Sequence, residues 1–162
     1  MARVVLVGLP GAGKSTLARA LAERLGCGVL DTDEVLAGRV GTPAAAYLRE
    51  VGEGRFRAAE LEALDEALEA DAVVATGAGV VTRAEARERL RRERAVWLDA
   101  PDATLLERVG GGDRPLLGAR PAEALADLRR ERRPLYEAVS RAVVDTSGSL
   151  EDALARLLEA VS

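Results

Sequence analysis

The sequence has 162 residues, enough for one folded domain with its own core, and we expect residues 1–162 to form that single domain. Its 23 Lys and Arg residues and 27 Asp and Glu residues give a net charge of −4, which argues against a nucleic-acid partner because such a partner requires a basic face. With no His, one Cys and no long apolar run, the chain lacks the groups for His-based catalysis, an internal disulfide or a membrane span, and we expect it in the cytoplasm.

Strand-like and helix-like segments alternate along the chain, which predicts an α/β domain on a central parallel sheet flanked by helices. Short apolar runs predict five strands, which begin in chain order within residues 3–7, 29–30, 72–75, 95–98 and 143–144. Apolar periodicity predicts helices at residues 15–25, 53–70 and 150–161, and Thr42 and Pro43 predict the N-cap and first position of another. Residues 110–121 are rich in Gly, Pro and Arg, which predicts a mobile lid between two helices.

Residues 8–15, GLPGAGKS, match the phosphate-binding pattern G-x-x-x-x-G-K-[ST] in full. The motif lies between a predicted buried strand and a predicted helix, where glycines allow successive backbone N–H groups to point toward phosphate oxygens. In this arrangement Lys14 reaches the β- and γ-phosphates and the Ser15 hydroxyl binds Mg²⁺. Lys14 is also the one Lys among the 23 cationic side chains. The sequence therefore predicts a site for ATP and Mg²⁺ made by Gly11, Ala12, Gly13, Lys14, Ser15 and Thr16.

Two carboxylates follow the second predicted strand in the segment LDTD, at Asp31 and Asp33. We expect the two carboxylates to point to opposite sides of this segment and therefore to have different tasks. We expect them on an extended segment, with one directed at the Mg²⁺ shell and the other at the phosphoryl acceptor. A helix cap is the alternative role for an Asp that follows a strand.

Four features in the expected order resemble the shikimate kinases, and the resemblance extends over nearly the whole chain. They are LDTD at 30–33, GEGRFRAAE at 52–60, the turn GAG at 77–79, and RPLL at 114–117 followed by RRPLY at 132–136. The resemblance implies a P-loop kinase fold and transfer of a phosphoryl group from ATP to a hydroxyl of shikimate. The products would be shikimate 3-phosphate and ADP, in the pathway to chorismate, and we expect a monomer.

The resemblance also implies roles for individual residues. Asp31 would lie with Ser15 on the metal side, whereas Asp33 would bind the shikimate hydroxyls and take the proton of the attacking one. Arg114 in the lid would close over the β- and γ-phosphates, and Arg108 would stack on adenine. Lys14, Asp33 and Arg114 are thus the expected catalytic residues.

Shikimate carries a carboxylate, which a planar guanidinium recognises through two parallel hydrogen bonds. The resemblance assigns this contact to Arg57 and Arg132, with Arg133 as the alternative to Arg132, and Glu60 is expected to orient Arg57. Further donors are expected from the turn made of Gly77, Ala78 and Gly79. Because the family has three glycines in this turn, we expect Ala78 to have a negative φ.

Three other functions are less consistent with the sequence. A gluconate kinase normally carries a His in its acceptor loop, and a nucleoside-monophosphate kinase fits the spacing of the later motifs less well. A catalytically silent regulatory relative is expected to have lost Lys14, Asp33 or Arg57, and all three are present. Residues 146–149, TSGS, also lack the Asn-Pro pair often found beside adenine in the family.

Overall fold

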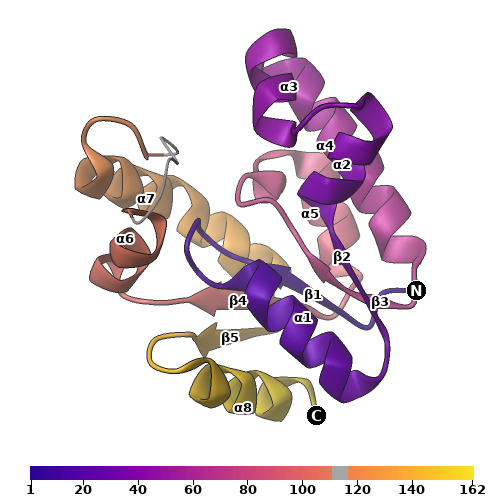
Figure 1. The fold of residues 1–162 in the computed structure, drawn as a ribbon, viewed down its shortest axis with the longest axis vertical. Coiled ribbons are helices and arrows are strands. Elements are labelled where there is room, and N and C mark those ends of the chain that lie inside the picture. The colour runs from indigo at the N-terminus through magenta and orange to yellow at the C-terminus, as the bar shows by residue number, and fades with distance from the viewer. Residues whose placement is uncertain (111–116) are drawn as a thin grey trace.

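The computed structural model describes residues 1–110 and 117–162, which contain five parallel strands in one sheet with the order β2-β3-β1-β4-β5 (Figure 1). The strands are β1 (Val4–Val7), β2 (Gly28–Asp31), β3 (Ala72–Ala75), β4 (Ala95–Asp99) and β5 (Ala142–Asp145). Since β1 pairs with both β3 and β4, it lies at the centre of the sheet, and each of its residues is buried. This explains its continuous apolar run, which is typical of a strand covered on both faces.

Helices cover both faces of this sheet. The helical elements are α1 (Lys14–Leu25), α2 (Thr32–Val40), α3 (Ala44–Val51), α4 (Glu53–Glu69), η1 (Val80–Thr82), α5 (Ala84–Arg91), α6 (Asp102–Gly110), α7 (Pro121–Val139) and α8 (Leu150–Val161). Helices α1 and α8 lie on one face, and α4, α5 and α7 lie on the other (Figure 1). The α/β class, the parallel sheet and the five strands predicted from the sequence are therefore confirmed.

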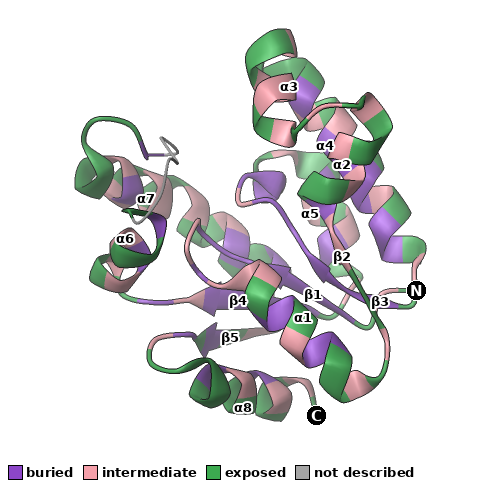
Figure 2. Ribbon diagram, viewed as in Figure 1, coloured by how far each residue is buried: buried purple, intermediate pink, exposed green. Residues whose placement is uncertain are grey.

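A second, smaller group of apolar side chains joins α2, α3 and α4 to one another. Leu36, Phe56 and Ala63 are buried at its centre, and Tyr47 and Leu48 of α3 pack against them. No residue of α3 is itself buried, and Figure 2 shows this helix in the colours of exposed and intermediate residues. The three helices lie on one side of the loop between β1 and α1, whereas α6 and α7 lie on the other (Figure 1).

Three local predictions need correction or restriction. The segment after β2 is not extended, because α2 begins at Thr32, directly after the strand. Helix α3 begins at Ala44 with Pro43 in the N-cap position, so the prediction that Thr42 is the cap was wrong. Of the lid predicted at 110–121, residues 111–116 lie outside the described part of the structure. Within the described part, no helix has the length and apolar character needed to cross a membrane.

Candidate active site

The glycine-rich loop between β1 and α1 has the backbone geometry that its sequence predicts. Gly11 and Gly13 adopt φ values of 83° and 92°, which L-residues with side chains rarely adopt. A Cβ on Gly11 would also lie 2.8 Å from the Leu105 carbonyl oxygen of α6, so the loop packs too closely for a larger residue. Helix α1 begins at Lys14, and its N-terminal N–H groups contribute partial positive charge next to the loop.

Lys14 lies across this loop and is partly buried. Its Nζ donates to the carbonyl oxygens of Gly8 at 2.6 Å and Leu9 at 3.1 Å. Burial lowers the pKa of Lys14 from 10.5 to about 8, although the charges of Asp33 and Asp31 oppose that decrease. The ammonium group therefore gains from any additional negative charge placed at the loop, such as the phosphates of a nucleotide.

Ser15 and Asp31 place two oxygen ligands together at the edge of the loop. The Ser15 hydroxyl donates to Oδ2 of Asp31 at 2.7 Å, while Oδ1 of Asp31 accepts the backbone N–H of Asp33 at 2.9 Å. Asp31 is thus the N-cap of α2 and also faces Ser15. A hydroxyl and a carboxylate at this spacing suit Mg²⁺, which prefers oxygen ligands and takes the remainder from phosphates and water.

Asp33 lies in the first turn of α2, which corrects the expectation of an extended segment. It nevertheless differs in position from Asp31. Asp31 faces Ser15, whereas Oδ1 of Asp33 is 3.0 Å from the point that a Cβ on Gly77 would occupy. Although Asp33 is open to the cavity, the surrounding wall desolvates it and raises its pKa. The charge of Asp31 raises the pKa of Asp33 further, whereas Lys14 and Arg57 lower it. A carboxylate with a raised pKa in a cavity is suited to proton transfer.

Arg57 projects from α4 toward the turn that follows β3. Its Nη1 donates to Glu60 at 2.8 Å and its Nε donates to Glu53 at 3.0 Å, which confirms the expected pairing with Glu60. The Glu60 side chain is only 4% exposed, and burial raises its pKa while Arg57 lowers it. A Cβ on Gly79 would lie 2.6 Å from Nη1 of Arg57, so the guanidinium packs directly against the turn.

Three side-chain hydroxyls hold the turn of residues 77–79. The Gly77 N–H donates to Thr32 Oγ1 at 3.0 Å, and the Ala78 carbonyl accepts from the Tyr136 hydroxyl at 2.6 Å. The Gly79 carbonyl accepts from Thr82 at 2.7 Å. Ala78 has a negative φ, as expected, because positive φ values in the described residues occur only at glycines. Thr32 and Tyr136 were not identified as site residues from the sequence.

Of the two adjacent arginines of α7, the structure directs Arg132 and not Arg133 to the interior. Arg133 is 63% exposed and pairs with Glu137 at 3.0 Å. Nε of Arg132 is buried and has no hydrogen-bond partner among the described residues. The Arg132 charge also acts on the pKa values of Lys14 and Glu60, which belong to the loop and to the Arg57 ion pair.

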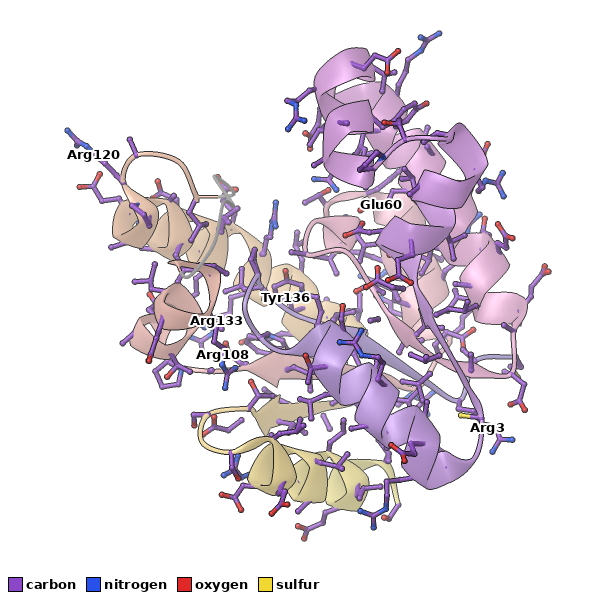
Figure 3. The ribbon with its side chains drawn as sticks, viewed as in Figure 1. Arg3, Glu60, Arg108, Arg120, Arg133 and Tyr136 are labelled. Atoms are coloured by element: carbon purple, nitrogen blue, oxygen red, sulfur yellow. The ribbon has the colours of Figure 1, made fainter. Side chains whose placement is uncertain are left out.

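Arg108 of α6 contacts the glycine-rich loop from the other side. Its Nη1 donates to the Gly11 carbonyl at 3.1 Å and to Thr146 Oγ1 at 3.2 Å, and Thr146 in turn donates to the Ala12 carbonyl at 2.7 Å. A cavity of about 270 Å³ lies here and is lined by Ala12, Gly13, Thr16, Leu17, Arg108, Thr146, Gly148, Leu150 and Ala153. It lies where a base attached to phosphates in the loop would extend. Figure 3 labels Arg108 together with Glu60 and Tyr136.

A larger cavity, of about 670 Å³, joins most of the predicted site residues. Its lining includes Gly11, Gly13, Lys14, Ser15, Thr16, Asp31, Asp33, Gly77, Ala78 and Arg108. Gly79, Arg57 and Arg132 are not on its lining in the described structure. The Arg57 guanidinium packs against Gly79, and its charge lowers the pKa of Asp33, which is on the lining. Arg114 lies outside the described residues.

Comparisons with known proteins agree with this geometry. The sequence model of the shikimate kinase family matches residues 10–162. A shikimate kinase from Frankia casuarinae is 45% identical over 160 residues, covering 97% of this chain and 71% of that protein. One from Thermobifida fusca is 42% identical over 156 residues, covering 95% of this chain and 91% of that protein.

Solved structures of other proteins resemble the fold closely. The shikimate kinase from Acinetobacter baumannii in complex with shikimate superposes with a TM-score of 0.90 at 36% identity, covering 96% of this chain and 90% of that one. A gluconokinase from Sinorhizobium meliloti reaches a TM-score of 0.61 at 19% identity, a likeness that concerns the fold alone.

Proposed function

This chain belongs to the shikimate kinase family and phosphorylates shikimate with ATP, and we propose that the residues around its glycine-rich loop perform the transfer as follows. Residues 11–16 bind the triphosphate through backbone N–H groups and Lys14. Lys14 stabilises the charge on the transferred phosphoryl group, and the bound phosphates in turn offset the burial that lowers the pKa of its ammonium group to about 8. The products are shikimate 3-phosphate and ADP.

Mg²⁺ is the metal that fits the pair of Ser15 and Asp31. Their oxygen atoms lie 2.7 Å apart at the edge of the loop and belong to different elements, α1 and the end of β2. When bound there, the ion neutralises charge on the β- and γ-phosphates. Asp31 also accepts a hydrogen bond from the backbone N–H of Asp33. This bond keeps Asp31, on the metal side, at a fixed separation from Asp33, on the acceptor side.

Asp33 is the proposed contact for the acceptor hydroxyl. Its carboxylate lies between Lys14 and Gly77, so that it faces both the phosphate-binding loop and the turn after β3. In this position it orients the attacking oxygen and accepts its proton. Little base strength is needed, because phosphoryl transfer depends mainly on positioning and on neutralisation of charge.

The carboxylate of shikimate is proposed to bind Arg57, Arg132 and the turn of residues 77–79. Arg57 is oriented by Glu60 and Glu53, and the Arg132 guanidinium has a buried Nε without a described partner. An unpartnered buried donor is costly, so a carboxylate ligand would satisfy a group that the protein leaves unpaired. Arg133 pairs with Glu137 on the surface, so its guanidinium already has a carboxylate partner.

Roles are also proposed for two further arginines. Arg108 lines the cavity of about 270 Å³ next to Thr16 and is suited to stacking on adenine. Arg114 is proposed to contact the β- and γ-phosphates, on the basis of its RPLL motif. We also propose that a monomer is active, because residues of a single chain supply both the phosphate-binding loop and the proposed acceptor contacts.

The position of Asp33 between the loop and the turn is the observation that carries these assignments. We would measure ADP release with shikimate, gluconate and nucleoside monophosphates as acceptors in parallel. We expect release with shikimate only. Preferred turnover of gluconate or of a nucleoside monophosphate would overturn the assigned acceptor, and Mg²⁺-independent release would overturn the metal site.

A further inference from the structure

Among the described residues that hold the turn 77–79, Tyr136 comes from the C-terminal part of the chain. Its hydroxyl donates to the Ala78 carbonyl at 2.6 Å across 58 residues, whereas Thr82 is three residues from its own acceptor. The Tyr136 side chain is fully buried, and its ring stacks on Trp97 of β4 with a centroid separation of 5.8 Å. Figure 3 shows Tyr136 near the centre of the molecule. The ring therefore has little freedom to move the hydroxyl away from the turn.

Helix α7 carries Tyr136 and Arg132 on the same side. The two residues are four apart, and residues at that spacing lie above one another on a helix. Arg132 is near enough to the Tyr136 hydroxyl to oppose part of the increase in its pKa. One hydroxyl thus connects the helix that presents Arg132 to the turn that presents backbone N–H groups.

We propose that Tyr136 is a positioning residue for the acceptor, whose hydroxyl fixes the turn 77–79 relative to Arg132 so that both face one carboxylate. The proposal rests on the proposed function, in which the turn and Arg132 bind the shikimate carboxylate. Tyr136 itself touches neither substrate nor phosphate in this arrangement. It acts by fixing the distance between the turn 77–79 and Arg132 of α7.

The chemistry of the hydroxyl is suited to a permanent contact. Burial raises the pKa of Tyr136 to about 12, so the hydroxyl keeps its proton and continues to donate at every pH of a normal assay. Without the hydroxyl, the Ala78 carbonyl loses this donor and the turn loses its hydrogen bond to α7. Bidentate recognition of a carboxylate depends on small displacements, so this loss would affect the acceptor and leave the nucleotide site unchanged.

The test is Tyr136→Phe, which removes one oxygen atom, with Tyr47→Phe as the matched control. Tyr47 is the chain's other tyrosine and packs in the cluster of Leu36, Phe56 and Ala63. For Tyr136→Phe we expect KM for shikimate to rise about tenfold while KM for ATP stays unchanged, the size that follows from one lost hydrogen bond at a buried acceptor. Tyr47→Phe is expected to leave both values unchanged.

Two further measurements separate positioning from stability. Wild-type enzyme should discriminate strongly between shikimate and its carboxamide analogue, and Tyr136→Phe should discriminate less. In an Arg132→Ala background, the added Tyr136→Phe substitution should raise KM for shikimate by a smaller factor than in the wild type, because the hydroxyl acts through Arg132.

The proposal is overturned by a Tyr136→Phe enzyme with a lower Tm but wild-type KM and discrimination, since that result describes a purely structural residue. Equal increases in both KM values, or full additivity with Arg132→Ala, overturn it as well. The proposed function is tested separately, with wild-type enzyme in the same assay. If wild-type protein releases no ADP with shikimate, the function fails before Tyr136 is considered.

Discussion

The guanidinium of Arg57 occupies the space that a side chain on Gly79 would need. A Cβ on Gly79 would lie 2.6 Å from Nη1 and 2.7 Å from Cζ of Arg57, well inside van der Waals contact. The backbone of Gly79 has φ −94° and ψ 5°, which any residue adopts, so the requirement for glycine is one of space and not of conformation. Arg57 is held in this position by hydrogen bonds to Glu60 and Glu53, so a side chain on Gly79 would have to displace the guanidinium from it.

Gly79→Ala should therefore displace Arg57 and weaken binding of the acceptor. We expect KM for shikimate to rise by about tenfold or more with KM for ATP unchanged, as measured by steady-state ADP release. Gly54→Ala is the matched control, because Gly54 lies on the same helix as Arg57 and a Cβ there meets nothing within 4 Å. Equal KM values for shikimate in both variants would show that the contact between Arg57 and Gly79 is not used.

Arg132 and Arg133 form a second matched pair. Arg132→Ala should weaken shikimate binding strongly, since truncating one partner of a buried charged contact typically costs about 2–5 kcal/mol. Arg133→Ala removes an exposed ion pair with Glu137, and exposed pairs contribute little. Calorimetric titration with shikimate distinguishes the two, and a larger loss for Arg133→Ala would reverse the assignment.

The strands and the glycine-rich loop were predictable because their signals are local. The apolar run of β1 and the motif up to Ser15 each depend on a few adjacent residues. The start of α2 was not predictable in this way. A short strand and a helix meet at Asp31 without a turn between them, so the segment LDTD gives no sign of where one ends and the other begins.

The contacts of the acceptor turn depend instead on tertiary structure. Thr32 and Gly77 are 45 residues apart, and Tyr136 and Ala78 are 58 apart, so no periodicity relates them. The choice between Arg132 and Arg133 likewise requires the orientation of α7 against the sheet. The only sequence signal for Thr32 and Tyr136 is their place inside the motifs LDTD and RRPLY, where the charged residues carry the clearer chemical signal.

Asp31 and Asp33 should respond differently to loss of charge, although only Asp31 lies on the expected extended segment and Asp33 lies in the first turn of α2. Asp31→Asn keeps a residue suited to the N-cap but weakens the site beside Ser15, so activity should need more Mg²⁺ while shikimate binding is retained. Asp33→Asn should lose turnover with nucleotide binding retained. Mg²⁺ titration and calorimetry with each ligand provide the measurement. Indistinguishable ligand profiles for the two variants would contradict separate roles.

Lys14 links the phosphate site to the pH dependence of stability. Its pKa is about 8 in the folded protein and 10.5 when unperturbed, so between these values the unfolded chain binds more protons than the folded one. Stability of the nucleotide-free protein should therefore rise as pH increases from about 8 to about 10. Above about pH 10, Tyr136 opposes this rise in stability. Its pKa is raised in the folded protein, so the folded state keeps the hydroxyl proton that the unfolded chain loses.

Lys14→Ala should abolish phosphoryl transfer and also remove that rise in stability, since the buried charge responsible for it is gone. Urea unfolding from pH 7 to pH 10, with and without ATP, measures both effects. Bound phosphates stabilise the protonated ammonium and raise its pKa, so ATP should flatten the pH dependence of the wild-type protein and leave the variant unaffected. Near-normal turnover in a folded Lys14→Ala protein would remove the basis for the ATP site, and an unchanged pH profile would show that another group causes the rise.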